Sequence, residues 1–169
     1  MTWKPYINQL LPLKDKLYRL ALRVVGTEAE AEDVVQEVFM KMWKKRDEAA
    51  TILNKEAWIV QMTKNLAIDK SRSKHRRTLS INKDFDLVGI QPQPDRVAEV
   101  QDTVSRVHQL IATLPEKQKM VIQLRDIEGH SYQEISEMLD MPMNSVKATL
   151  FRARQFLKTQ IEKANDYGL

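Results

Sequence analysis

Apolar residues recur along the chain at helical spacing, and they predict a succession of amphipathic helices. A helix over residues 14–25 carries its apolar face at Leu17, Leu20, Ala21 and Val24. Gly26 ends this helix, and Thr27, with a glutamate three residues later, forms a capping box that opens a longer helix. A third helix, over residues 56–77, is apolar on nearly every side in its first half, which predicts the buried central helix of a domain.

The helical period stops after residue 77. Pro92 and Pro94 stand among mixed polar residues, which predicts a flexible linker over residues 79–96. The next helix is expected to have its apolar face at Val97, Val100, Val104, Val107 and Ile111. A further helix is expected to start with Pro115 at its first position, where a missing N–H costs nothing.

The segment 131–158 predicts two helices joined by a tight turn. Ser131 and Glu134 form a second capping box at the start of the first of these helices. Asp140 occupies the turn position that is often glycine, and aspartate tolerates a left-handed backbone better than most residues. Asn144 is expected to cap the second helix. A helix, a tight turn and a second helix are typical of the DNA-binding helix-turn-helix motif.

This last helix has two different faces. Its core face consists of Val146, Leu150, Ala153 and Leu157. The opposite face consists of Ala148, Phe151, Arg152 and Gln155, flanked by Ser145 and Lys147. A helix that turns a phenylalanine and a guanidinium away from its own core offers both to a partner, and a basic outer face suits the DNA major groove. The alternative is a solvated basic face on an ordinary helical hairpin.

Composition narrows the class of protein. The 169 residues are 43% hydrophobic with only 4 Gly, which predicts an all-α protein of two small helical domains, residues 1–78 and 97–169. The net charge is +4 and the pI about 9.2, and the excess lies in residues 1–77, at +6 against −2 for the rest. A basic excess favours a polyanionic partner. The absence of cysteine excludes disulfides and thiolate chemistry.

Several functional classes are not supported by the sequence. No apolar run reaches membrane-spanning length and the first residues lack a signal-peptide pattern, so we expect a cytoplasmic protein without membrane insertion. There is no glycine-rich phosphate loop and no paired metal-ligand spacing, and His75, His108 and His130 are scattered. We therefore expect no catalytic residue, no cofactor, no metal site and no enzymatic activity.

Two charged surfaces remain as candidate binding sites. On the second helix, the side opposite the core carries Asp33, Gln36, Glu37 and Met40, which form either a docking patch for a basic partner helix or a merely solvated acidic face. On the third helix, a basic run consists of Lys64, Lys70, Arg72, Lys74, Arg76 and Arg77.

This basic run is placed to follow a phosphate backbone. Asn65 and Asp69 share one helical face with Arg72 and Arg76, and Trp58 and Asn65 are suited to an unstacked base, by stacking and by hydrogen bonds to its edge. The alternative is a core tryptophan, a helix-end cap and a solubilising basic tail.

The order and spacing of these segments resemble those of a bacterial RNA polymerase sigma factor of the extracytoplasmic-function (ECF), sigma-70-like group. The first part of sigma region 2 is similar to residues 17–45, LYRLALRVVGTEAEAEDVVQEVFMKMWKK, and its promoter-facing part is similar to residues 57–77, AWIVQMTKNLAIDKSRSKHRR. Sigma region 4 is similar to residues 114–154, LPEKQKMVIQLRDIEGHSYQEISEMLDMPMNSVKATLFRAR.

The resemblance implies a role for each part of the first domain. The patch Asp33, Gln36, Glu37 and Met40 would bind the clamp helices of the largest subunit of core RNA polymerase. The loop 47–55 would lie where the family captures a flipped −10 base. Residues of the strand-opening motif would be Trp58, Lys64, Asn65 and Asp69, and the basic residues Arg72, Arg76 and Arg77 would hold promoter phosphates.

In the second domain, the resemblance implies binding to the flap of the second-largest subunit and to the −35 element of promoter DNA. The −35 contacts would come from Ser145, Lys147, Ala148, Thr149, Phe151 and Arg152. Ala148 replaces a common serine and Thr149 a common arginine, and both changes reduce hydrogen-bonding capacity. An anti-sigma factor is the further partner that the resemblance implies.

Two other classes of protein compete with this interpretation. One is a free-standing helix-turn-helix regulator that binds DNA without polymerase, although no dimerisation helix is apparent to match a two-fold operator. The other is a helical protein-interaction module, whose DNA binding would show only a weak dependence on salt.

Overall fold

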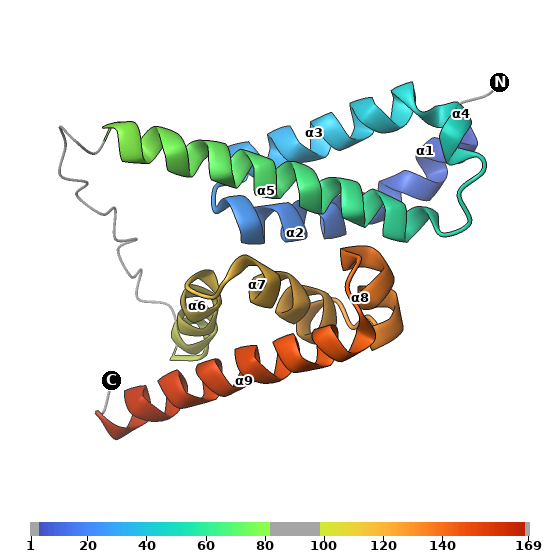
Figure 1. Cartoon of the computed structure of the whole chain (residues 1–169). Coiled ribbons are helices and arrows are strands. Elements are labelled where there is room, and N and C mark those ends of the chain that lie inside the picture. The colour runs from blue at the N-terminus through green and yellow to red at the C-terminus, as the bar shows by residue number, and fades with distance from the viewer. Residues whose placement is uncertain (1–3, 82–98, 168–169) are drawn as a thin grey trace.

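The computed structural model describes residues 4–81 and 99–167, and every regular element within these ranges is helical (Figure 1). The all-α prediction is therefore confirmed for the described part of the chain. The expected linker, residues 79–96, lies outside the described residues except for its first three positions, which continue the helix that ends at Ile81.

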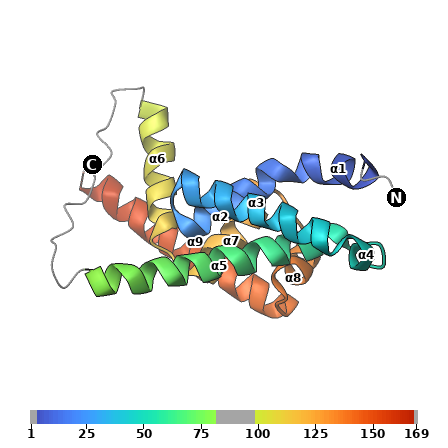
Figure 2. The same cartoon turned by 90° about the horizontal axis from the view of Figure 1, so that it is seen from above.

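The N-terminal domain is built from three long helices and two short ones. Its elements are α1 (Lys4–Leu10), a 3-10 turn (Leu11–Leu13), α2 (Lys14–Val25), α3 (Glu28–Lys44), α4 (Arg46–Ala49) and α5 (Lys55–Ile81). Helices α2, α3 and α5 pack against one another, and α3 and α5 run side by side in both views (Figures 1 and 2). The core between them includes Leu17, Leu20, Val34, Val38, Ile59 and Val60. The predicted central role of α5 is confirmed.

Local sequence signals set the boundary between α2 and α3. Gly26 has φ +87°, a left-handed conformation that ends α2, and its N–H donates to the carbonyl of Leu22 at 2.9 Å. The hydroxyl of Thr27 accepts from the backbone N–H of Glu30 at 3.4 Å, as the capping box predicted. Both expectations are confirmed.

The C-terminal domain holds the helix-turn-helix. Its elements are α6 (Glu99–Ala112), α7 (Glu116–Ile122), a π-helical segment (Gln123–Ile127), α8 (Tyr132–Leu139) and α9 (Met143–Asp166). Helix α9 lies along the domain and contacts α6, α7 and α8 (Figure 1). Its buried side chains meet a core that includes Ile111, Leu114, Val121, Leu124 and Ile135.

The tight turn of the motif forms as expected. The hydroxyl of Ser131 accepts from the N–H of Glu134 at 3.1 Å and starts α8. Asp140 adopts φ +52° and ψ +54°, and its N–H donates to the carbonyl of Ser136, so it ends α8 as a left-handed cap. Within the described residues, Asp140 is the only non-glycine residue with positive φ.

Three local expectations are wrong. Asn144 does not cap α9, because Pro142, with ψ 143°, already turns the chain and Met143 is the first helical residue. Pro115 likewise precedes α7 with ψ 150° and is not its first helical residue. Val104, expected on the apolar face of α6, is exposed because the C-terminal domain covers only the end of this helix around Ile111.

The two domains lie against each other. Helix α8 packs on α5, and α7 packs on α2, so that the helix-turn-helix half of one domain contacts the central helix of the other (Figure 1). In the orthogonal view α9 crosses beneath α5 (Figure 2). The sequence contained no indication of this contact.

Candidate nucleic-acid interface

The first turns of α9 present a mixed apolar and basic surface. Val146, Leu150 and Ala153 are buried as predicted, which leaves the other side of the helix in solvent. Phe151 is 64% exposed, an unusual position for a phenylalanine that has no partner within its own domain to cover it. Arg152 is exposed beside it. Exposed apolar and basic side chains on one helix face are suited to contacts in the DNA major groove.

One member of the expected −35 set does not share this surface. Thr149 is only 7% exposed, because its position falls beside Val146 and Leu150 on the core side of α9. Its side chain therefore faces the core of the domain, whereas the resemblance implied a contact with the −35 element. Ser145 and Ala148 are half-buried at the margin, and Lys147 is exposed.

Residues that sequence reasoning missed hold this helix in place. Arg154 donates from Nε to Oδ2 of Asp126 at 3.1 Å and from Nη2 to Oδ1 of the same carboxylate. This bidentate hydrogen bond raises the pKa of Arg154 above its ordinary value. The ring of Tyr132 is covered by the guanidinium of Arg125 at 4.5 Å and faces the ammonium of Lys147 at 5.7 Å. The sequence indicated these contacts only through the many charged residues in and near the helix-turn-helix.

The acidic face of α3 is accessible along its length. Asp33, Gln36 and Glu37 are exposed, and Met40 is 60% exposed although it is apolar. Trp43, one turn further, is also exposed and is stacked under the guanidinium of Arg46 at 4.6 Å. The sequence analysis did not include Trp43, although its spacing of three residues from Met40 extends the same face.

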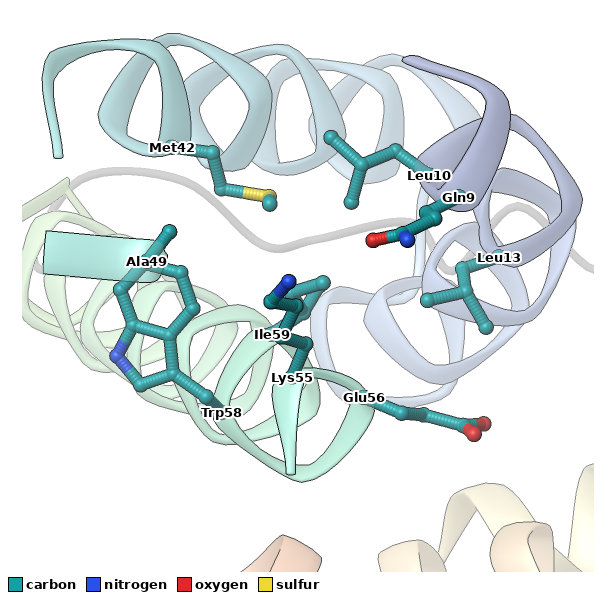
Figure 3. Close-up of a pocket in the computed structure, with 9 residues that line it drawn as sticks. All are labelled: Gln9, Leu10, Leu13, Met42, Ala49, Lys55, Glu56, Trp58 and Ile59. Carbon is teal, nitrogen blue, oxygen red and sulfur yellow. The ribbon is translucent and has the colours of Figure 1, made fainter. Parts of the chain in front are cut away.

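A pocket of about 220 Å³ lies beside the start of α5 (Figure 3). The indole of Trp58 forms one wall, opposite Leu10 and Met42, and Ala49 of α4 stands beside it (Figure 3). The sequence analysis expected an irregular loop over residues 47–55, whereas its first three residues belong to α4. A mostly apolar pocket with an aromatic wall is suited to a flat, unstacked ring.

A groove of about 290 Å³ runs between α3 and α5. Asn65 and Asp69 line it from α5, as their shared helical face predicted. On its other side it is lined by Lys41 and Lys44 of α3 and by Lys45, which follows α3, and sequence reasoning had given these lysines no role. The groove thus combines hydrogen-bonding groups with a cluster of positive charge, the combination that holds a single nucleic-acid strand.

The basic run of α5 divides into two sets. Lys70 and Lys74 turn toward α3, where they pair with Asp33 at 3.4 Å and Glu30 at 3.3 Å. Arg72, Arg76 and Arg77, near the end of the helix, are exposed.

Lys64 belongs to neither set. It points to the C-terminal domain and donates to the carbonyl of Leu139 at 3.1 Å. The structure therefore separates Lys64 from Trp58, Asn65 and Asp69, with which the sequence analysis had grouped it.

No group of side chains in the described ranges is arranged to hold a metal ion. Over the same residues, none of the helices combines the length and the apolar character needed to cross a bilayer.

Comparison with known proteins matches both halves of the chain to one family. Residues 11–77 match the model of Sigma-70 region 2, and residues 105–157 match that of Sigma-70, region 4. The ECF RNA polymerase sigma factor SigW of Bacillus subtilis is 31% identical over 160 residues, which cover 88% of this chain and 84% of that protein. The chain belongs to the ECF sigma factors. Other ECF members are similar, including the sigma-E factor of Escherichia coli, 28% identical over 156 residues.

Not every relative has the same length. The ECF sigma factor SigE of Mycolicibacterium smegmatis is 30% identical over 153 residues, and the match spans 58% of that protein. Among solved structures, the sigma factor RpoE of Bartonella quintana, crystallised with the anti-sigma factor NepR, has a TM-score of 0.73 and 24% identity. That comparison covers 94% of this chain and 98% of RpoE, and it establishes the two-domain ECF fold.

Proposed function

We propose that the chain is an alternative sigma factor, which binds core RNA polymerase and directs promoter-specific initiation through the −10 and −35 elements. The observation that carries this proposal is the presence of sigma regions 2 and 4 in order on one chain, with their candidate contact faces largely exposed. Region 2 corresponds to the domain of residues 1–78 and region 4 to that of residues 97–169, with a linker between them.

The acidic face of α3 is the proposed polymerase contact. Asp33, Gln36, Glu37 and Met40 lie exposed on one side of a well-packed helix, which suits docking onto the clamp helices of the largest subunit. Region 4 would bind the flap of the second-largest subunit. Each contact alone is modest, and the linker makes the second contact intramolecular once the first has formed.

The pocket and groove between α3 and α5 are the proposed −10 site. An unstacked base would lie against Trp58, while Asn65 and Asp69 meet base edges and Arg72, Arg76 and Arg77 meet phosphates. Lys64 would join this set only after it leaves the carbonyl of Leu139. The function is binding and strand positioning, without a catalytic step by this chain.

The exposed face of α9 is the proposed −35 site. Arg152 is suited to a guanine edge and Phe151 to a thymine methyl group, with Lys147 on a neighbouring phosphate and Ser145 and Ala148 at the margin. Because Thr149 is buried, the preference for base sequence would come from fewer side chains than the sequence indicated.

We further propose that an anti-sigma factor regulates the chain in the cytoplasm. The Bartonella RpoE, which shares the fold, was crystallised with its anti-sigma factor NepR, and CnrH, with a TM-score of 0.69, was solved with the cytosolic domain of CnrY.

Co-migration with bacterial core RNA polymerase on gel filtration tests the proposed function. We expect a stoichiometric complex with the purified chain, and loss of this complex when Asp33→Lys and Glu37→Lys are combined. A matched control combines Asp15→Lys and Asp47→Lys, which make the same charge change at exposed positions outside the patch. If the folded, inhibitor-free wild type formed no complex with core polymerase, the result would favour a free-standing regulator.

A further inference from the structure

The pocket beside the start of α5 has one wall that comes from outside sigma region 2. The match to Sigma-70 region 2 begins at residue 11, whereas Gln9 and Leu10 of α1 line the pocket together with Trp58 of α5. The resemblance assigned no contact with promoter DNA to α1. A role for this helix in the pocket is therefore indicated by the structure alone.

Leu10 fixes the position of this wall. Its side chain is 3% exposed and belongs to the core of the N-terminal domain, against which Leu13 also packs. Pro12 lies in the 3-10 turn that connects α1 to α2. Because Leu10 is anchored, the adjoining Gln9 is held at the pocket, and its amide group points into the cavity (Figure 3). Among the described residues, none forms a hydrogen bond with this amide.

The apolar part of the pocket is suited to holding a base but not to choosing one. The volume of about 220 Å³ is below the roughly 300–1,000 Å³ of pockets that take drug-sized molecules, so it suits a fragment the size of one base. Trp58 offers a ring on which a base can stack, and such stacking tolerates every base. Discrimination between bases must therefore come from the polar side chains.

The polar lining of the pocket comes from Gln9, Lys55 and Glu56, which are not equivalent. The carboxylate of Glu56 accepts from Nζ of Lys16 at 2.7 Å and points away from the cavity (Figure 3). Lys55 is the first residue of α5, a position where the helix dipole disfavours a cation. Positions that break a local rule of this kind are often functional. Gln9 and Lys55 are thus the side chains suited to meet the edge of a base.

The amide of Gln9 can distinguish bases because it offers an acceptor oxygen beside a donor NH₂ group. Paired with adenine, for example, an amide accepts from the amino group and donates to a ring nitrogen. A base whose edge does not supply a donor next to an acceptor loses one of these two bonds. The ammonium group of Lys55 only donates, so it adds a bond to a further acceptor of the base.

We infer that the amide of Gln9 reads the edge of the unstacked −10 base, so that part of the promoter preference is set by α1. Lys55 supplies a second donor, and Trp58 holds the base by stacking without selecting it. The inference rests on the proposed function, because it requires the −10 strand to enter this pocket. It adds a specificity-determining residue that lies outside the match to region 2.

The first test measures base preference at each position of the −10 element. Binding of the reconstituted holoenzyme is compared for promoters that carry each of the four bases in turn. We expect Gln9→Leu to reduce discrimination at one position by about tenfold, the loss of one bidentate pair, and to leave the other positions unchanged. Asn8→Leu removes the neighbouring exposed amide, which does not line the pocket, and should keep the parental preference. Unchanged discrimination in Gln9→Leu would overturn the inference.

A variant of the stacking residue separates holding from reading. Trp58→Phe keeps an aromatic ring of smaller area, so it should weaken binding of all four bases at that position to a similar extent. If Trp58→Phe instead abolished the preference while Gln9→Leu retained it, the shape of the pocket would select the base and the inference would be wrong.

The second test measures proximity directly. The chain has no cysteine, so Gln9→Cys carries a single thiol. In the complex with polymerase and promoter, we expect this thiol to form a disulfide with a thiol-tethered base at the position identified by the first test. Asn8→Cys is the matched control and should not cross-link there. If Gln9→Cys cross-linked at no position of the −10 element, α1 would lie away from the strand, which contradicts the inference.

Polymerase binding separates this inference from the proposed function. Gln9 is not part of the acidic face of α3, so Gln9→Leu and the parent should form the polymerase complex equally well. If the parent bound no polymerase or selected no promoter, the proposed function would be wrong. If the parent selected promoters and Gln9→Leu kept the full discrimination, only the inference would be wrong.

Discussion

Asp140 shows how much one backbone conformation contributes to the helix-turn-helix. It ends α8 with φ +52°, a region in which most L-residues are strained and which glycine adopts readily. The neighbouring Pro142 then starts α9 without any side-chain cap. The angle between the two helices of the motif depends on these few residues and on the packing behind them.

Asp140→Gly should therefore stabilise the protein, by about 0.5–1 kcal/mol, because glycine relieves the strain of positive φ. Asp140→Ala should destabilise it by a similar amount, since alanine keeps the strain and loses the polar side chain. Urea unfolding at constant m-value measures both changes. A glycine variant less stable than the parent would mean that the aspartate side chain contributes more than its backbone strain costs.

The two arginines of α9 have different roles. Arg152 is exposed on the proposed DNA face, while Arg154, two residues later, is bound to Asp126 of the π-helical segment. Helical spacing predicted Arg152 on the outer face, whereas the partner of Arg154 was decided by the position of Asp126.

Arg152→Ala should reduce discrimination at one base pair of the −35 element by about 1–3 kcal/mol, because a guanidinium can donate two hydrogen bonds to guanine. Arg154→Ala is the matched control, and we expect it to lower the stability of the C-terminal domain without changing which base is preferred. Binding of the reconstituted holoenzyme to a set of single-base variants of the promoter gives the measurement. An unchanged base preference in Arg152→Ala would remove this residue from the −35 site.

One contact between the domains involves a titratable group, His108. The Nδ1 atom of His108 in α6 lies 3.0 Å from Nη2 of Arg23 in α2, so the neutral imidazole accepts a hydrogen bond from the guanidinium. Burial, and secondly the charge of Arg23, lower the pKa of His108 below its ordinary value of 6.5. Lys119 of α7 adds a further positive charge near Arg23.

The sign of the pH dependence follows from this shift. His108 binds a proton more readily when the two domains are apart than when they are packed together, so packing of the domains is favoured above pH 6.5 and weakens as the pH falls below 6.5 toward the lowered pKa. Energy transfer between fluorophores placed at Ala29→Cys in α3 and Thr159→Cys in α9, both exposed, should decrease over that window, and His108→Gln should remove the decrease. Glu128, whose pKa lies below its ordinary value of 4.5, should add a separate loss only at more acidic pH. A decrease that persists in His108→Gln would assign the titration to another group.

The sequence by itself determined the helices, their caps at Thr27 and Ser131, the left-handed Asp140 and the buried stripe of α9. These features depend on residues within about one or two helical turns of one another, and helical periodicity and capping are local properties. Family resemblance supplied the order of sigma regions 2 and 4. The same resemblance placed Thr149 among the −35 contacts, but Thr149 is buried on the core side of α9.

Tertiary structure alone decided how the two domains meet. Arg19 and Glu128 are 109 residues apart, and Lys64 and Leu139 are 75 apart, so no periodicity or motif links them. The lysines of α3 joined Asn65 and Asp69 in one groove only because α3 and α5 pack side by side. Which charged residues are free to bind a partner and which are already bound within the molecule depends on these distant contacts, and a linear pattern of charges does not contain that information.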